Sequence, residues 1–182
     1  MILALDISTS VIGVALFGLE NDNYKLHELS YKKFKPKHNL FEKIDEFKDF
    51  FKEYEDLTIT DISIEEPLKK FKGKFSNADT IQKLTQMNAM ISLFLYEKTG
   101  IQPTYYNVSS ARSIVFPELK MPKSHPNKKY LIWEAVNKAE PKIIWKYSKT
   151  THKLIDENFD MADAWVVGMA HVCSKINSKT LA

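Results

Sequence analysis

The chain has 182 residues, of which 44% are hydrophobic and 12% aromatic, a composition that predicts a single domain over residues 1–182 and excludes two large domains. Its 26 basic and 23 acidic residues give a net charge of only +3, which by itself does not indicate a nucleic-acid partner. No apolar run reaches the ~18 residues of a membrane span, and the single cysteine, Cys173, has no partner within the chain. We therefore expect a soluble protein of a reducing, cytoplasmic compartment, without a membrane partner.

Three β-rich runs open the chain, over residues 2–8, 11–17 and 24–34. Only short polar segments separate them, which is typical of antiparallel neighbours joined by turns. Helices and strands then alternate: a helix over 40–54, a strand over 57–66, a helix from residue 77 or 78 to 98, a strand over 104–108, a helical turn from residue 109 or 110, a helix over 127–139 and a last helix across 158–172. This order predicts an α/β fold with a mixed five-stranded sheet flanked by helices.

An aspartate interrupts the first strand, MILALDI, whose alternation places Ile2, Ala4 and Asp6 on one face. Aspartate is disfavoured within strands, and burying its charge is costly unless a cation or a donor meets it. Either Asp6 belongs to a functional site, or this strand lies at the edge of the sheet and Asp6 faces water.

Two glutamates end the strand DISIEE, directly before Pro67. Glu65 shares its face with Ser63, whereas Glu66 shares the face of the two isoleucines of this strand. Either glutamate is a candidate functional residue, and a merely polar strand end is the alternative.

Two aspartates, Asp160 and Asp163, stand one turn apart in the last, largely apolar helix. Their spacing of three residues places both carboxylates on one face. The alternative is that the helix begins here, with Asp160 as its N-cap and Asp163 as an acid of the first turn.

Acidic residues of three separate segments therefore stand where local rules do not require them, which often marks a functional site. If they converge, the cluster needs cations in order to remain ionised. Carboxylate oxygens suit Mg²⁺ or Mn²⁺, and no Cys or His spacing in the chain indicates a zinc site.

The lysines are clustered in three runs, over residues 68–75, 120–129 and 142–153. The first run interleaves four lysines with two aromatic residues: Lys69, Lys70, Phe71, Lys72, Lys74 and Phe75. These runs are either solvated loops or phosphate contacts that include stacking rings. Because Arg112 is the only arginine, we expect any bound DNA to be recognised by its backbone and shape more than by its sequence.

Four segments, in this order, resemble the RuvC-type Holliday junction resolvases, which are nucleases of the ribonuclease H fold: LALDISTSVIGVAL, ISIEEPL, NADTIQKLTQMNAMI and FDMADAWVVGMAH. Ile7-Ser8 replaces the Pro-Gly that usually follows the first aspartate in cellular members, so the chain is more similar to phage and viral members. Leu68 stands where many members have an aromatic residue, which leaves Phe71 or Phe75 as the candidate wedge at the junction.

The resemblance implies an endonuclease that resolves four-way or branched DNA, works as a homodimer, uses two Mg²⁺ or Mn²⁺ ions and leaves 5′ phosphates. It implies a set of catalytic and metal-binding carboxylates, in which Glu65 rather than Glu66 matches: Asp6, Glu65, Asp160 and Asp163. It also places Lys129, and less well Lys128, near the scissile phosphate. The expected DNA-binding residues are the lysines and phenylalanines of the 68–75 run together with Lys123 and Lys128.

Three alternatives arise at the level of sequence. A branched-DNA-binding protein of the same fold without catalysis is the alternative function. Actin-like ATPases and sugar kinases also begin with such a hairpin, but they need two domains and glycine-rich phosphate loops, whereas this chain has five glycines and no such loop. The helix of residues 78–96 is apolar on many sides, so it either forms a dimer contact or is fully buried.

Overall fold

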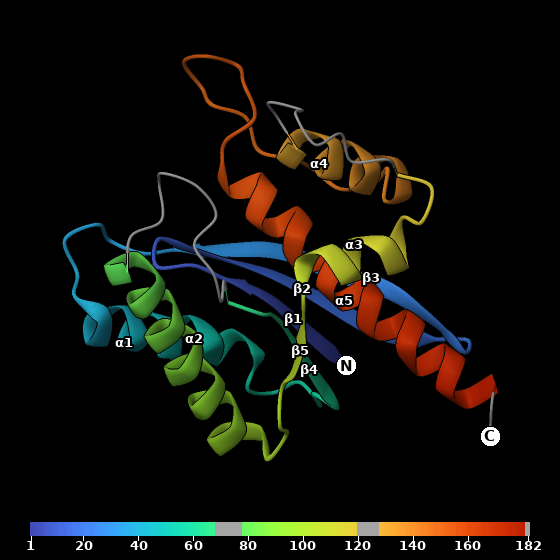
Figure 1. Cartoon of the computed structure of the whole chain (residues 1–182), viewed down its shortest axis with the longest axis horizontal. Helices are drawn as coiled ribbons and strands as arrows, with labels where there is room; N and C mark the ends of the chain where they lie inside the picture. Colours follow the sequence, from blue (N-terminus) through green and yellow to red (C-terminus); the bar gives the residue numbers. More distant parts are fainter. Residues whose placement is uncertain (68–77, 120–127, 181–182) are drawn as a thin grey trace.

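The computed structural model describes residues 1–67, 78–119 and 128–180, with a five-stranded sheet of order β3-β2-β1-β4-β5 at its centre (Figure 1). The strands are β1 (Ile2–Ile7), β2 (Val11–Glu20), β3 (Asn23–Lys33), β4 (Asp61–Glu65) and β5 (Thr104–Tyr106). β1, β2 and β3 are antiparallel neighbours, while β4 is parallel to both β1 and β5. The prediction of a mixed α/β sheet is confirmed.

The helices cover both faces of the sheet (Figure 1). They are α1 (Leu40–Phe51), α2 (Ala78–Thr99), α3 (Val108–Val115), α4 (Lys128–Ala139) and α5 (Glu157–Thr180). Helices α1 and α2 enclose one apolar core against the sheet, and α3, α4 and α5 enclose a second core on the opposite face. None of the helices in the described part of the chain is long and apolar enough to cross a membrane.

The alternation of β1 divides its side chains between these cores. Leu3 and Leu5 pack in the core of α1 and α2, whereas Ile2 and Ala4 pack in the core of α5. Asp6 continues the second face, toward α5. Since β1 is the central strand, the alternative in which Asp6 lies on an edge strand and faces water is wrong.

Several predicted boundaries differ from the structure. β4 begins at Asp61 rather than at residue 57, because the preceding residues form turns in which Leu57 N donates to the Tyr54 carbonyl. β5 ends at Tyr106, since Asn107 caps α3 by accepting a hydrogen bond from Ser109 N at 3.0 Å. Residues 52–54, predicted as helix α1, form a 3-10 turn instead.

The last helix begins earlier than predicted, at Glu157, and continues to Thr180. Asp160 therefore lies inside the first turn and is not the N-cap, so that interpretation of Asp160 and Asp163 is wrong. The backbone turn in which Phe159 N donates to the Asp156 carbonyl at 3.0 Å starts the helix instead.

A glycine of β2 sets the position of α5 on the sheet. Gly13 pairs with Asp6 in the ladder between β1 and β2. A Cβ atom built on Gly13 would lie 2.0 Å from the carbonyl oxygen of Asp160, so only glycine allows this close approach of the two backbones. The contact fixes the start of α5 directly beside Asp6.

We predict that Gly13→Ala lowers the free energy of unfolding by about 1–3 kcal/mol or more, because the added methyl group forces α5 away from β2. The same shift weakens Mn²⁺ binding at the predicted carboxylate site. Urea denaturation and Mn²⁺ titration by electron paramagnetic resonance measure the two effects.

Gly100→Ala is the matched control for this glycine. Gly100 ends α2 at a φ of +70° with open space around its Cα, so alanine there strains the backbone far from the site. It lowers stability and leaves Mn²⁺ binding unchanged, whereas equal Mn²⁺ affinity in Gly13→Ala would show that the contact does not position the site.

Candidate functional site

Three carboxylates meet at the carboxyl ends of the two central parallel strands. Asp6 is near the end of β1 and Glu65 ends β4, and the parallel register, in which Leu5 pairs with Ile64, brings them side by side. Asp163 reaches the same place from the second turn of α5. One carboxylate oxygen from each of Asp6, Glu65 and Asp163 lies within 4.8 Å of the other two.

The fourth predicted carboxylate lies outside this group of three. Asp160 is one turn earlier on α5, and its Oδ1 is 4.0 Å from the Nζ of Lys129 at the start of α4. Burial raises the pKa of Asp160 to about 6, although the ammonium of Lys129 opposes the shift. The charge of Asp160 still raises the pKa values of Asp6 and Glu65, so it acts on the cluster electrostatically.

The three clustered acids make ionisation costly for one another. Burial, followed by the charges of Glu65 and Asp163, raises the pKa of Asp6 well above its ordinary value. Burial and the charge of Asp163 raise the pKa of Glu65 to about 7, while Arg112 and Lys129 act in the opposite direction. Near neutral pH the cluster therefore holds protons unless another cation replaces them.

The cluster fits a hard divalent cation. All its donors are carboxylate oxygens, which suit Mg²⁺ or Mn²⁺. The Oε2 atom of Glu65 is buried and has no hydrogen-bond partner in the described part of the protein, so it is available as a ligand. An unsatisfied buried carboxylate oxygen is unfavourable in a purely structural role.

Arg112 belongs to the site, although nothing in its local sequence indicates this role. Its Nη2 donates to the Oδ1 of Asp163 at 2.7 Å, and Asp163 is 7% exposed. Its Nε is buried and has no partner among the described residues. Arg112 also lines a cavity of about 330 Å³, whose wall is polar and basic on one part (Ser109, Ser113 and Lys128) and apolar on the other (Phe116, Pro117 and Leu119).

A second set of polar contacts fastens α5 at the other end of β4. His171 of α5 contacts Asp61 Oδ1 through Nε2 at 3.2 Å and the Tyr106 hydroxyl through Nδ1 at 3.1 Å. Lys175 Nζ donates to both oxygens of Asp61 at 2.6 Å. Burial acts to raise the pKa of Asp61, but hydrogen bonds from Lys175, Thr60 and His171 hold it below its ordinary value.

The described residues include only part of the predicted DNA-binding set. Lys128 and Lys129 are exposed at the start of α4, on the same side as the carboxylates. Glu66, the alternative to Glu65, is not one of the three clustered acids, and its backbone N donates to the Tyr106 carbonyl at 2.9 Å. The remaining predicted contacts lie outside the described residues: Lys69, Lys70, Phe71, Lys72, Lys74, Phe75 and Lys123.

Comparisons with known proteins identify the fold. No protein-family model and no curated protein sequence matches the chain. RuvC of Thermus thermophilus aligns at a TM-score of 0.65 and 12% identity, over 97% of this chain and 96% of RuvC. The same protein in complex with a Holliday junction substrate aligns at 0.63 and 10%, over 96% and 94%. The Fowlpox virus resolvase with substrate Holliday junction DNA aligns at 0.56 and 15%, over 96% and 97%.

The chain therefore has the ribonuclease H-like fold of the RuvC and Fowlpox virus resolvases over nearly its whole length. The resemblance that the four sequence segments indicate is confirmed at the level of the fold. At 10–15% identity this likeness does not transfer residue roles, which rest on the geometry above.

We predict that Asp6→Asn raises the melting temperature at pH 8 in the absence of divalent ions, by about 2–4 °C for each kcal/mol of repulsion removed. The pKa of Glu65 is higher in the folded protein, at about 7, than its ordinary value, so its protonated form stabilises the fold at low pH. This contribution to stability is lost as the pH rises through about 7. The effect of the substitution is therefore small at pH 5 and large at pH 8.

Scanning calorimetry at both pH values, with and without Mn²⁺, measures this effect. Mn²⁺ raises the melting temperature of the parent protein more than that of Asp6→Asn. Asp45→Asn, at an exposed aspartate of α1, is the control and changes neither value appreciably. A lower melting temperature for metal-free Asp6→Asn at pH 8 would contradict the assignment of a strained carboxylate cluster.

A further prediction concerns the ion pair of Arg112 and Asp163. Arg112→Gln lowers the free energy of unfolding by about 3–5 kcal/mol, because it leaves the buried Asp163 carboxylate without its counter-charge. The double variant Arg112→Gln/Asp163→Asn loses less than the sum of the two single variants. Urea denaturation of all four proteins measures the coupling, and strict additivity would mean that the pair does not stabilise the site.

Proposed function

We propose that the protein is a structure-selective DNA endonuclease that resolves Holliday junctions and other branched DNA by divalent-metal-dependent phosphodiester hydrolysis. One observation carries the proposal: Asp6, Glu65 and Asp163, from three separate elements, bring carboxylate oxygens within 4.8 Å of one another. The fold supports it, because solved structures that share this fold include two resolvases in complex with Holliday junction DNA.

The proposed cofactor is a pair of Mg²⁺ or Mn²⁺ ions. Asp6, Glu65 and Asp163 would hold them, and Asp160 would contribute a carboxylate from the preceding turn of α5. When bound, such ions supply an activated water as nucleophile and stabilise the charge on the leaving 3′ oxygen, which leaves 5′ phosphates on the products.

The residues of the chain itself contribute position and charge. Asp6 and Glu65 are held on adjacent central strands, so their carboxylates keep a fixed separation. Arg112 orients the Asp163 carboxylate through its hydrogen bond of 2.7 Å. The side chain of Lys129 is 61% exposed and its Nζ is 4.0 Å from Asp160 Oδ1, so in the proposed reaction its ammonium would meet the scissile phosphate.

A homodimer with one site in each subunit would cut the two symmetry-related strands of a junction. Helix α2 supports this proposal, because Leu93 and Tyr96 are 58% and 51% exposed while Ile91 and Leu95 on its other side are buried. The alternative of a helix fully buried within its own chain is therefore wrong. Analytical ultracentrifugation of the purified protein measures the oligomeric state.

A branched-DNA-binding protein without catalysis is the second candidate function. Two observations favour the enzyme: Glu65 Oε2 has no hydrogen-bond partner among the described residues, and the pKa of Asp6 is raised. A binding protein gains nothing from a strained carboxylate cluster next to phosphates.

We predict that the protein cuts a labelled four-way junction in Mg²⁺ and not in EDTA, and that Asp6→Asn and Asp163→Asn slow cleavage by roughly a thousandfold, equivalent to about 4 kcal/mol in the barrier. Both variants bind the junction as tightly as the parent or more tightly, because each removes negative charge near phosphates. Gel-based cleavage and fluorescence anisotropy measure the two quantities separately.

The exposed Asp45→Asn serves again as the control and cuts at the parental rate. Cleavage without divalent ions would rule out the proposed chemistry. Parallel loss of binding and cleavage in both variants would assign these carboxylates to the fold. Binding of the junction by the parent protein without any cutting would support the second candidate function.

A further inference from the structure

An aromatic cavity of about 410 Å³ includes residues that are next in sequence to Lys129 and Asp160, and it has no part in the proposed hydrolysis. Its volume lies within the range of small-molecule sites, roughly 300–1,000 Å³. Four aromatic rings, one aliphatic side chain and one lysine line it: Tyr130, Trp133, Tyr147, Phe159, Leu154 and Lys153. Aromatic rings combined with a cation are the groups that bind unpaired nucleotides, whose bases stack and whose phosphates need positive charge.

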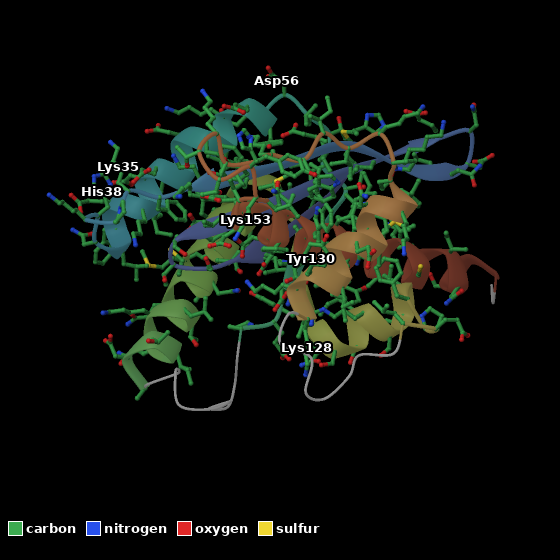
Figure 2. All side chains as sticks on the ribbon, turned by 90° about the horizontal axis from the view of Figure 1, so that it is seen from above. Lys35, His38, Asp56, Lys128, Tyr130 and Lys153 are labelled. Carbon is green, nitrogen blue, oxygen red and sulfur yellow. The ribbon has the colours of Figure 1, made fainter. Side chains whose placement is uncertain are left out.

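The cavity is adjacent in sequence to the proposed catalytic residues on two different helices. Tyr130 follows Lys129 in α4, and Phe159 precedes Asp160 in α5. Because consecutive Cα atoms are about 3.8 Å apart, the cavity begins within reach of a nucleotide next to the scissile phosphate. Lys128, Tyr130 and Lys153 lie on the same face of the molecule, over α4 and the loop that follows it (Figure 2).

The aromatic wall is held in place before any ligand binds. The rings of Tyr130 and Trp133 are 5.0 Å apart between centroids, and Trp133 contacts Trp145 edge to face at 5.8 Å. Trp145 is fixed in turn by a hydrogen bond of 2.8 Å from its Nε1 to Asn137 Oδ1 in α4. A preformed wall loses little conformational freedom on binding, which favours affinity.

The loop over residues 140–156 forms the opposite wall and is also anchored. Tyr147 and Leu154 form an isolated antiparallel bridge across it. The buried side chain of Asn158 in α5 accepts from Lys146 N at 3.1 Å and donates to the Lys146 carbonyl at 2.6 Å. Tyr147 is nevertheless 55% exposed and Tyr130 42%, so both rings present area to an incoming group.

The charge of the loop that contributes Tyr147, Lys153 and Leu154 to the cavity indicates the class of occupant. The loop carries an excess of lysine over acidic residues, with Lys142, Lys146, Lys149 and Lys153 against Glu140 and Asp156. An apolar peptide or an acyl chain would not be matched by this charge, whereas a polyanion that carries π faces is matched by both features.

We propose that this cavity binds an unpaired nucleobase of the DNA next to the cut, stacked on Tyr147 and Tyr130, with the adjoining phosphate at Lys153. The inference rests on the proposed function, because it adds a second subsite to the same DNA-binding face. Its consequence is selectivity: a branch point can release an unpaired base at low cost, whereas a fully paired duplex must first be unstacked.

The test measures affinity without divalent ions, so that no strand is cut, and uses the full chain. Fluorescence anisotropy is recorded for a four-way junction, a duplex of matched sequence and an oligothymidylate single strand. The proteins are the parent, Tyr147→Ala, Tyr147→Phe, Lys153→Gln and the control Phe41→Ala, whose ring is 72% exposed on the distant helix α1. Melting temperatures of all five confirm that they are folded.

Tyr147→Ala is expected to lower the affinity for the junction and the single strand about tenfold, while duplex affinity stays within about twofold. Tyr147→Phe keeps the ring and the parental affinities, and Phe41→Ala changes none of them. Lys153→Gln weakens binding of the junction and the single strand and lowers the salt slope by up to ~0.9 for the lost phosphate contact.

An unchanged junction-to-duplex ratio in Tyr147→Ala, with either unchanged or uniformly reduced affinities, would overturn the proposal. The two proposals fail separately in this design. If the parent protein does not cut junctions in Mg²⁺ but its single-strand affinity depends on Tyr147, the proposed function is overturned and the base-binding cavity stands. If the protein cuts junctions and its affinities do not depend on Tyr147, only the base-binding proposal is overturned.

Discussion

The mutual repulsion of Asp6, Glu65 and Asp163 is the constraint on which the rest of the structure depends. Carboxylate oxygens at 4.8 Å repel by about 3.5 kcal/mol per ionised pair at an effective dielectric constant near 20. This repulsion favours protonated carboxyls, as the raised pKa values of Asp6 and Glu65 indicate. It also needs a scaffold stiff enough to keep the three groups together. The architecture around the site supplies that stiffness from the core and not from loops.

Helix α5 is the part of this scaffold that the repulsion would displace first, and it is fixed at both ends. Near its start, the backbone of Asp160 rests directly on Gly13 of β2. Farther along, His171 and Lys175 hold it to Asp61 at the beginning of β4. Asp61 and Glu65 stand at opposite ends of β4, so one strand both carries a carboxylate of the cluster and anchors the helix that carries another. Arg112 adds a positive partner that is hydrogen-bonded directly to one carboxylate of the cluster, Asp163.

Period-two alternation and element order predicted the features that depend on local pattern. The run MILALDI assigned Asp6 to the face of Ile2 and Ala4, and the order of elements gave the mixed sheet. Features that depend on distant segments were not predictable in this way. Alternation alone did not choose between Glu65 and Glu66, because the choice depends on the register in which Leu5 pairs with Ile64.

Longer-range contacts were missed for the same reason. Arg112 and Asp163 are 51 residues apart and meet only because α3 and α5 pack in the same core. The error over Asp160 as an N-cap has a local cause: aspartates at positions 156, 160 and 163 are all acceptable near a helix start. The turn at Asp156, which starts the helix, is the feature that excluded the other two.

The start of α4 joins the carboxylate cluster to the groups that would recognise DNA under the proposed function. Three consecutive residues there contribute to three different sites. Lys128 lines the cavity of Arg112, Lys129 faces Asp160, and Tyr130 lines the aromatic cavity. Successive residues of a helix point about 100° apart, so one turn distributes its side chains among three adjoining sites. Under the proposed function, the carboxylate cluster would have no means of its own to distinguish a branch from a duplex. Selectivity for branched DNA would then come from the flanking groups, and α4 holds those groups at fixed positions relative to the carboxylates.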